Sequence, residues 1–199
     1  SYIMRNLIFS ILLLFTSLSS VNAQNIKVTS IPTTVEEFVE MRNQKAEIPE
    51  GAAAMFLLAL KIYTQNPELG KQCFVVIVDR KLLREGNVYK GFAIFNSEMS
   101  LIKSQMNKNK LIPNSYIKGS TTSNNYAVNL PYEYEFLIQK EHYSGHVPKK
   151  DDYKLFVTCS GASSPRPMSL RKNNRGIWKV CNWSSVLVGI AKPEIDDDL

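Results

Sequence analysis

The sequence predicts an α+β fold in which helices from the N-terminal half pack against a mainly antiparallel, curved sheet from the C-terminal half. Two observations predict this class. Between residues 34 and 106, apolar residues recur at helical spacing and follow helix-capping residues. From residue 132 onward, apolar and polar residues alternate with a period of two, which is typical of strands with one buried face.

Residues 1–23 have the form of a secretory signal peptide. Met4 and Arg5 precede an apolar run from Leu7 to Leu18, and small residues stand at Val21 and Ala23. The apolar run is shorter than the roughly 20 residues that a membrane-spanning helix needs. We therefore predict cleavage after Ala23 and a secreted or periplasmic protein without a stable membrane span. A retained membrane anchor is the alternative.

Residues 24–192 are predicted to form a single α+β domain, followed by an acidic flexible tail at residues 193–199. The sequence contains 24 Lys and Arg against 18 Asp and Glu, a net charge of +6 that falls to +5 once Arg5 is removed. A modest excess spread along the chain indicates solubility rather than nucleic-acid binding, which requires clustered Lys and Arg. We expect no nucleic-acid partner.

A capping pair marks the first predicted helix. Thr34 stands three residues before Glu37, which is the spacing of a capping box, and apolar residues follow at helical spacing. Pro49 and Gly51 interrupt this helix. Residues 52–63 are rich in Ala, Leu and Met, which are strong helix formers, so we expect a buried central helix there.

A second start signal follows at residues 66–68, where Asn is the N-cap, Pro takes the first helical position and Glu lies near the positive end of the helix dipole. The β-branched residues of 73–78 favour a strand, but this cap, with Gly86 as a stop signal, favours a helix, which we predict. One more amphipathic helix is expected from Ser97 to Met106.

Four strands are predicted in the second half of the chain, at residues 132–139, 153–159, 166–172 and 176–183. The last two are joined by Asn173 to Gly176, whose residue types tolerate positive φ in a hairpin loop. Trp178 and Val180 share one face of the last strand by the two-residue period. We therefore expect Trp178 in the core.

Three cysteines, Cys73, Cys159 and Cys181, cannot all pair with one another. Cys73 lies in an apolar run and is interpreted as a buried hydrophobic residue. A bridge between Cys159 and Cys181 is not favoured. If they lie on the first and third strands of a meander, their separation is about twice the strand spacing of roughly 4.8 Å, too far for a disulfide.

No motif identifies a reaction, so the catalytic residues are left unassigned, and we predict neither a metal nor a cofactor. His142 and His146 have the spacing of two ligands on one helix face, and Asp151 and Asp152 could add oxygen ligands. Gly145, however, predicts a turn, and a hydrated loop is the simpler interpretation.

A series of motifs in fixed order resembles one uncharacterised bacterial family of secreted proteins, known only as a domain of unknown function. The motifs lie at residues 49–53, 66–70, 89–91, 115–119, 160–167, 171–179 and 183–185. The resemblance implies no reaction, cofactor or catalytic residue. At the level of architecture, the predicted arrangement is also similar to the cone-shaped nuclear-transport-factor-2-like folds, which implies a shape and no activity.

A ligand site is hypothesised in the second half of the chain, where hydroxyl and basic side chains gather. A ligand could bind Arg166 through a charge-assisted hydrogen bond and the serines through their hydroxyls. Two other residues belong to a motif of the resembled family and are expected near the same place. The candidate set is Ser160, Ser163, Ser164, Arg166, Tyr89 and Lys90, with further basic residues at Arg171, Lys172, Arg175 and Lys179. The alternatives are an ordinary solvated sheet face, and an Arg166 that only braces its loop.

Two classes of function follow from this sequence. The preferred one is an exported, non-enzymatic domain that binds a small molecule, glycan or protein. The alternative is an exported enzyme of unassigned chemistry. A pocket that encloses a titratable pair favours the enzyme, whereas an apolar or aromatic cavity without one favours binding.

Overall fold

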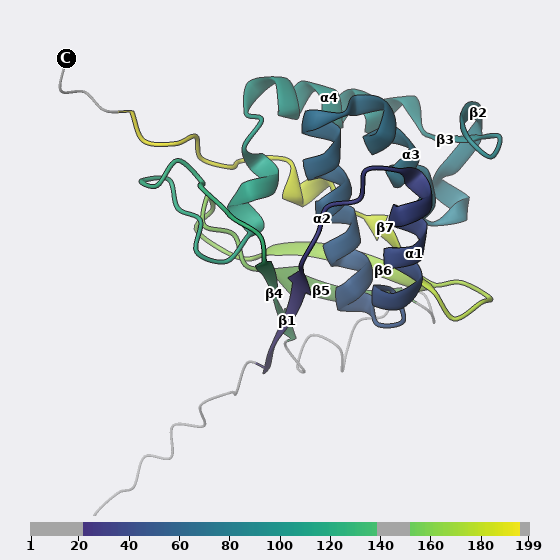
Figure 1. Ribbon diagram of the computed structural model, residues 1–199, viewed down its shortest axis with the longest axis horizontal. Helices are drawn as coiled ribbons and strands as arrows, with labels where there is room; N and C mark the ends of the chain where they lie inside the picture. Colours follow the sequence, from purple (N-terminus) through teal and green to yellow (C-terminus); the bar gives the residue numbers. More distant parts are fainter. Residues whose placement is uncertain (1–21, 139–151, 196–199) are drawn as a thin grey trace, which may run out of the picture.

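In the computed structural model, which describes residues 22–138 and 152–195, the chain forms four α-helices and a five-stranded antiparallel sheet, and α2 packs on the sheet (Figure 1). This confirms the predicted α+β class. The helices are α1 (Val35–Lys45), α2 (Pro49–Gln65), α3 (Pro67–Ile77) and α4 (Asn96–Lys108). The sheet has the order β1-β4-β5-β6-β7, with β1 at Asn22–Val28, β4 at Tyr132–Ile138, β5 at Asp152–Val157, β6 at Arg166–Lys172 and β7 at Trp178–Asn182.

The first helix begins at the predicted capping pair. The Thr34 hydroxyl accepts a hydrogen bond from the Glu37 N–H at 3.2 Å. The Glu37 carboxylate accepts one from the Thr33 N–H at 2.7 Å. These two bonds satisfy N–H groups that have no partner inside the helix. The helix ends at Lys45, and the following Ala46 is fully buried.

Helix α2 is the buried centre of the molecule, as predicted. Every residue from Glu50 to Ile62 is buried, because α1 and α3 pack on it from one side and the sheet from the other. Gly51 allows the close approach of α1. A Cβ at position 51 would overlap the carbonyl oxygen of Lys45, so only glycine fits there.

Helix α3 confirms that the cap signals outweigh β-branching in this segment. The Asn66 side chain accepts the Leu69 N–H at 3.2 Å, and Pro67 takes the first helical position. The predicted stop at Gly86 is wrong. The helix ends at Ile77, because Val78 takes an extended conformation and pairs with Val180 at the edge of the sheet.

Two strand pairings have no counterpart among the predicted elements. The first joins β1 to β4 along the whole of both strands, so the predicted start of the mature chain lies inside β1. The second is a separate hairpin of β2 (Leu83–Tyr89) and β3 (Phe92–Ile94). Its turn contains Lys90 and Gly91, both at positive φ, which explains the small, flexible residue at position 91.

The β6–β7 hairpin has the predicted turn, and the Asn173 side chain accepts the N–H groups of Arg175 and Ile177 at 2.9 Å each. Trp178, expected in the core, is only half-buried. It lies at the hairpin end of β7, where one side of its ring meets Tyr153 and Lys172 stands over it. The buried tryptophan is Trp183, which is 2% exposed and packs on Phe56.

The three cysteines are free, in agreement with the expected absence of a Cys159–Cys181 bridge. Cys159 follows β5 and Cys181 belongs to β7, so the whole of β6 separates them.

Within residues 22–138 and 152–195, no helix is long and apolar enough to cross a bilayer. His142, His146 and Asp151 lie outside the described residues. The expectation that they bind no metal therefore stays a prediction.

Candidate functional site

The candidate ligand residues lie in two groups at opposite ends of β6. Arg166 is the first residue of β6, and the candidate serines precede it. Tyr89 and Lys90 line a cleft that also contains Asn173, which directly follows β6. A seven-residue strand is about 20 Å long. The structure therefore does not bring the six residues into one site.

In the serine loop, residues 160–165, Ser160 forms hydrogen bonds with the structure around it. The Ser160 hydroxyl donates to the Ser115 carbonyl at 3.0 Å and lies 3.1 Å from the Ser120 hydroxyl. Its own backbone N–H donates to the same Ser115 carbonyl at 2.9 Å. Ser163 and Ser164 are exposed. Ser160 thus already has protein partners for its hydrogen bonds.

Arg166 also has a bracing contact. Its Nη2 donates to the Gly189 carbonyl at 3.1 Å, which ties the start of β6 to the segment after β7. The Nε of Arg166 is buried and has no partner. This arrangement supports the bracing interpretation of Arg166, and ligand binding at the serine loop stays a prediction.

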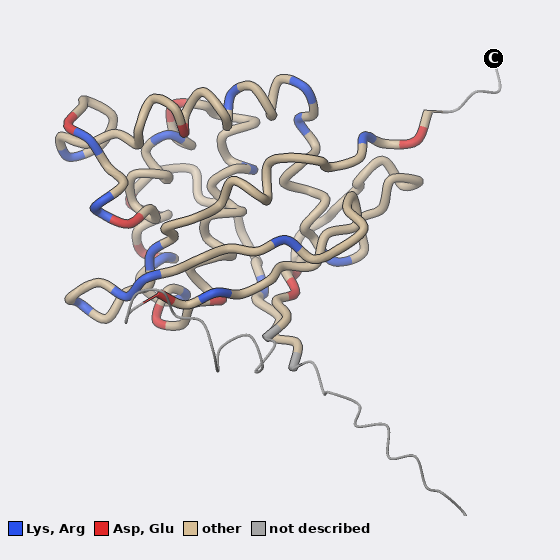
Figure 2. The backbone as a smooth tube through the Cα atoms, turned by 180° about the vertical axis from the view of Figure 1, so that it is seen from behind, with Lys and Arg blue, Asp and Glu red and all other residues tan. Residues whose placement is uncertain are grey.

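The other end of β6 forms a cleft of about 350 Å³, here called the basic cleft. It lies among α1, the end of α3 and the β2–β3 and β6–β7 hairpins, which extend on the same side of the molecule (Figure 1). Figure 2 shows Lys and Arg positions on both hairpins from behind. The charged and aromatic residues that line the cleft are Arg42, Asp79, Arg80, Tyr89, Lys90, Phe92 and Lys179.

Two of these cations converge on one backbone oxygen. The Arg42 Nη1 donates to the Val76 carbonyl at 2.9 Å, and the Lys179 Nζ donates to the same oxygen. Val76 lies in the last turn of α3, where the carbonyl end of a helix carries about half a negative elementary charge. The two full positive charges of Arg42 and Lys179 exceed this partial negative charge. The α3 end therefore positions both cations without neutralising them.

Burial makes both charges costly. The pKa of Lys179 is lowered to about 8, mainly by burial and also by the nearby charge of Arg42, while Asp79 opposes the change. Burial is also the main cause that lowers the pKa of Arg42. Neither side chain forms an ion pair with a carboxylate of the described residues. A bound anion would supply the missing negative charge.

Asp79 does not take this role, because it has other partners. Its carboxylate accepts the Lys81 N–H at 3.0 Å and pairs with Arg171 at 3.4 Å. Arg171 in turn binds Asp152 at 2.7 Å. Among the described residues that line the basic cleft, Asp79 is the only carboxylate. The cleft consequently keeps an excess of positive charge.

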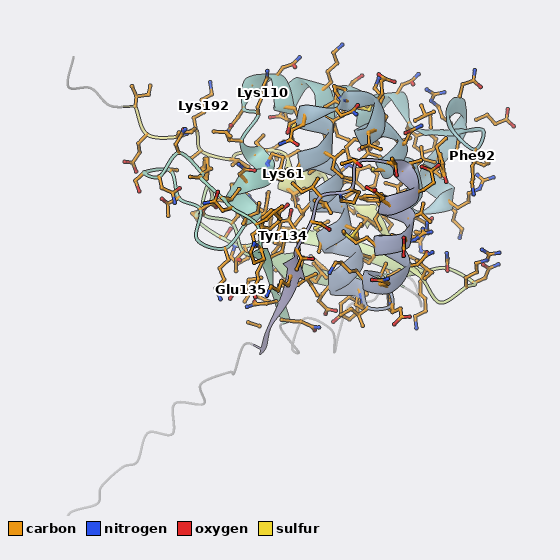
Figure 3. All side chains as sticks on the ribbon, in the orientation of Figure 1. Lys61, Phe92, Lys110, Tyr134, Glu135 and Lys192 are labelled. Carbon is orange, nitrogen blue, oxygen red and sulfur yellow. The ribbon has the colours of Figure 1, made fainter. Side chains whose placement is uncertain are left out.

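One wall of the basic cleft is aromatic. Phe92 lies at the β2–β3 hairpin, at the edge of the molecule (Figure 3). The Arg80 guanidinium carbon stands 3.7 Å from the centre of the Phe92 ring, and the Lys90 Nζ stands 5.5 Å from that of Tyr89. Cations held on ring faces in this way can meet the charged end of a ligand while the rings contact its apolar part.

The sequence hypothesis missed Arg42, Asp79 and Arg80 as site residues. Arg42 fits the helical pattern of α1, and nothing local distinguishes it from a solvated helix position. Lys179 belongs to the basic residues near the last hairpin. A usable signal was the presence of two hairpin motifs, at residues 89–91 and 171–179, since both supply residues that line the cleft.

The fold and the site together define an α+β domain with a basic cleft between two hairpins. The chain belongs to a family described as a domain of unknown function, DUF6935, whose model matches residues 30–194. That span includes every residue named above as lining the cleft. No curated protein and no solved structure matches the chain. The similarity to nuclear-transport-factor-2-like folds therefore stays a prediction.

Proposed function

We propose that this protein is a binding domain that captures a small anionic molecule in the basic cleft. The observation that supports this function best is the pair of cations, Arg42 and Lys179, held on one carbonyl oxygen without an ion-pair partner among the carboxylates that the structure describes. Folding places both charges in a partly buried site at a cost in stability. Binding an anion there would offset this loss of stability, so the site should favour negatively charged ligands.

The geometry narrows the chemistry of the ligand. A cleft of about 350 Å³ fits a small molecule rather than a folded partner. The guanidinium of Arg42 can bind a carboxylate, phosphate or sulfate group through two parallel hydrogen bonds. The rings of Tyr89 and Phe92 can contact an apolar or sugar face of the same molecule.

Binding of citrate to the folded chain, measured by titration calorimetry, tests this function. Citrate should bind the unsubstituted chain, and Lys179→Met should weaken its binding at least about tenfold, because a charge-assisted hydrogen bond contributes roughly 1.5–3 kcal/mol. The matched control is Lys103→Met, which removes the same charge from the exposed face of α4. Equal binding by the two variants would contradict the proposal.

We also propose that the protein is exported from a bacterial cell and works outside the cytoplasm. The support is the signal-like sequence of residues 1–23. Cleavage after Ala23 would leave residues 24–28 of β1 to pair with β4. Mass spectrometry of the N-terminus of exported protein should find Gln24 first. An intact Met4 terminus in the membrane fraction would overturn this proposal.

A further inference from the structure

The amine of Lys179 differs from that of an ordinary surface lysine. It lies in the wall of the basic cleft and donates to a backbone carbonyl, and within the described residues it has no ion pair. A buried lysine, Lys61, bonds to the Asn114 side chain at 2.6 Å and lies in the central helix α2, away from this cleft (Figure 3). Lys179 therefore combines a partly buried amine with access to a small-molecule cleft.

Arg42 stands next to this amine. Both groups donate to the Val76 oxygen, so their nitrogen atoms lie no more than about 6 Å apart, since a hydrogen bond spans about 3 Å. A carboxylate held by Arg42 would place the neighbouring atoms of the same ligand close to the Lys179 Nζ. The pair matches a molecule whose anionic group and electrophilic carbon are adjacent.

We propose that the basic cleft captures a small 2-oxo acid, with its carboxylate on Arg42 and its carbonyl carbon joined to Lys179 as an imine. This inference rests on the anion binding proposed above and names its ligand class. The neutral amine attacks the carbonyl carbon, and the carbonyl oxygen becomes a hydroxyl by taking a proton. Loss of that hydroxyl with a proton, as water, leaves the C=N bond. The balance is one amine and one carbonyl giving one imine and one water, with no oxidant or reductant.

Two features of the cleft favour this step. Imine formation needs an amine that has lost its proton, and burial beside Arg42 increases the neutral fraction of Lys179 at neutral pH. The apolar lining, which includes Val39, Val75 and Val78, gives the rest of the ligand apolar contacts beside the amine. Because the step is reversible, hydrolysis releases the ligand unchanged, which suits a binding site.

Reductive trapping of the full folded chain tests the proposal. Glyoxylate and sodium cyanoborohydride convert an imine into a stable secondary amine, which peptide mass spectrometry locates. We expect Lys179 to be labelled at least about tenfold more than the exposed Lys103, since a lower pKa leaves far more neutral amine. Propanal, which lacks the carboxylate, should show a smaller preference for Lys179. Equal preference for the two aldehydes would overturn the 2-oxo acid assignment.

Arg42→Met should lower the labelling of Lys179 by glyoxylate several-fold, whereas Arg84→Met, an exposed position on β2 outside the cleft, should not. Should Arg42→Met fail to fold, protection of the unsubstituted chain by excess citrate gives the same information. Citrate should shield Lys179 and leave Lys103 unaffected. If citrate binds but Lys179 is labelled no more than Lys103, the imine is wrong and the anion site stands. If citrate neither binds nor protects, the proposed function itself fails.

Discussion

At the Arg166 end of β6, polar side chains donate to backbone carbonyls and to one another. At the Lys172 end, two cations share one carbonyl and form no ion pair with a carboxylate of the described residues. Both ends are rich in polar residues in the sequence. The hydrogen bonds of the first end stabilise the fold. The uncompensated charges of the second end reduce stability, and a ligand can recover that loss. The residue types at the two ends are similar. The hydrogen-bond and ion-pair partners of the side chains therefore distinguish the structural loop from the candidate site.

The sharpest test of this difference is the stability of Lys179→Met. Because burial, with the neighbouring charge of Arg42, lowers the pKa of Lys179 from 10.5 to about 8, the charged amine costs up to about 3 kcal/mol of folding stability below that pH. The variant should therefore be more stable than the unsubstituted chain at neutral pH, with Arg42 still on the Val76 carbonyl. Guanidinium denaturation measures the difference.

The stability difference between Lys179→Met and the unsubstituted chain should depend on pH in a defined direction. Between about pH 8 and 10.5, the folded chain loses the Lys179 proton before the unfolded chain does, so this cost disappears as the pH rises. The stability advantage of Lys179→Met should shrink over that range. Raised pKa values at Cys181 and Tyr132 also change stability at high pH, but they act on both chains alike and cancel in the difference. An advantage independent of pH would contradict a charge effect.

Arg166→Ala should have the opposite outcome at the other end of β6. It removes the bond to the Gly189 carbonyl and the packing of the side-chain stem, so we expect a loss of about 1–2 kcal/mol in unfolding free energy. Citrate binding should not change. Thermal denaturation and calorimetry on one sample measure both quantities. Weaker citrate binding with unchanged stability would move the ligand site to the serine loop.

Ser160→Ala should destabilise the fold by less than Arg166→Ala does, about 0.5–1 kcal/mol in unfolding free energy. The Ser115 carbonyl keeps the Ser160 N–H as a donor, and Ser120 keeps its bond to the Ile117 carbonyl at 2.7 Å. Each partner therefore retains one bond. Urea denaturation resolves a change of this size, and a larger loss would show that the hydroxyl has a role beyond these contacts.

The smallest expected effect is that of Lys90→Met. Lys90 is exposed at the tip of the β2–β3 turn, so solvent screens its charge. We expect citrate binding to weaken about two-fold and the loss to vanish at high salt. Calorimetry at two salt concentrations checks this. A loss as large as that of Lys179→Met would place the anion at the mouth of the cleft.

The sequence predicted most helices because their signals are local. The caps at Thr34 and Asn66 determine helix starts through bonds that span only three residues. The strands β1 and β2 lack such signals. β1 begins inside the signal-like segment of residues 1–23, and β2 has mixed polar residues with Gly86 in its middle. Their pairings depend on distant partners, which periodicity does not reveal.

The basic cleft was predictable only in part for a related reason. Tyr89 and Lys90 came from a motif, and Lys179 came from a basic cluster. Arg42 joins them only because α1 and β7 both pack near the end of α3. Those contacts connect positions far apart in the chain, so a site of this kind has no local signature. The grouping of Tyr89 with the serine loop failed because β6 separates the two regions.

Gly51 has a consequence for how this family can vary. The carbonyl of Lys45 occupies the place of any side chain at that position, so α1 and α2 meet through bare backbone. A requirement of this kind comes from the fold and is independent of the ligand. Members of the family should therefore keep glycine at this position even where the residues of the cleft differ. An aligned set of sequences would separate the inherited framework from the part under selection for chemistry.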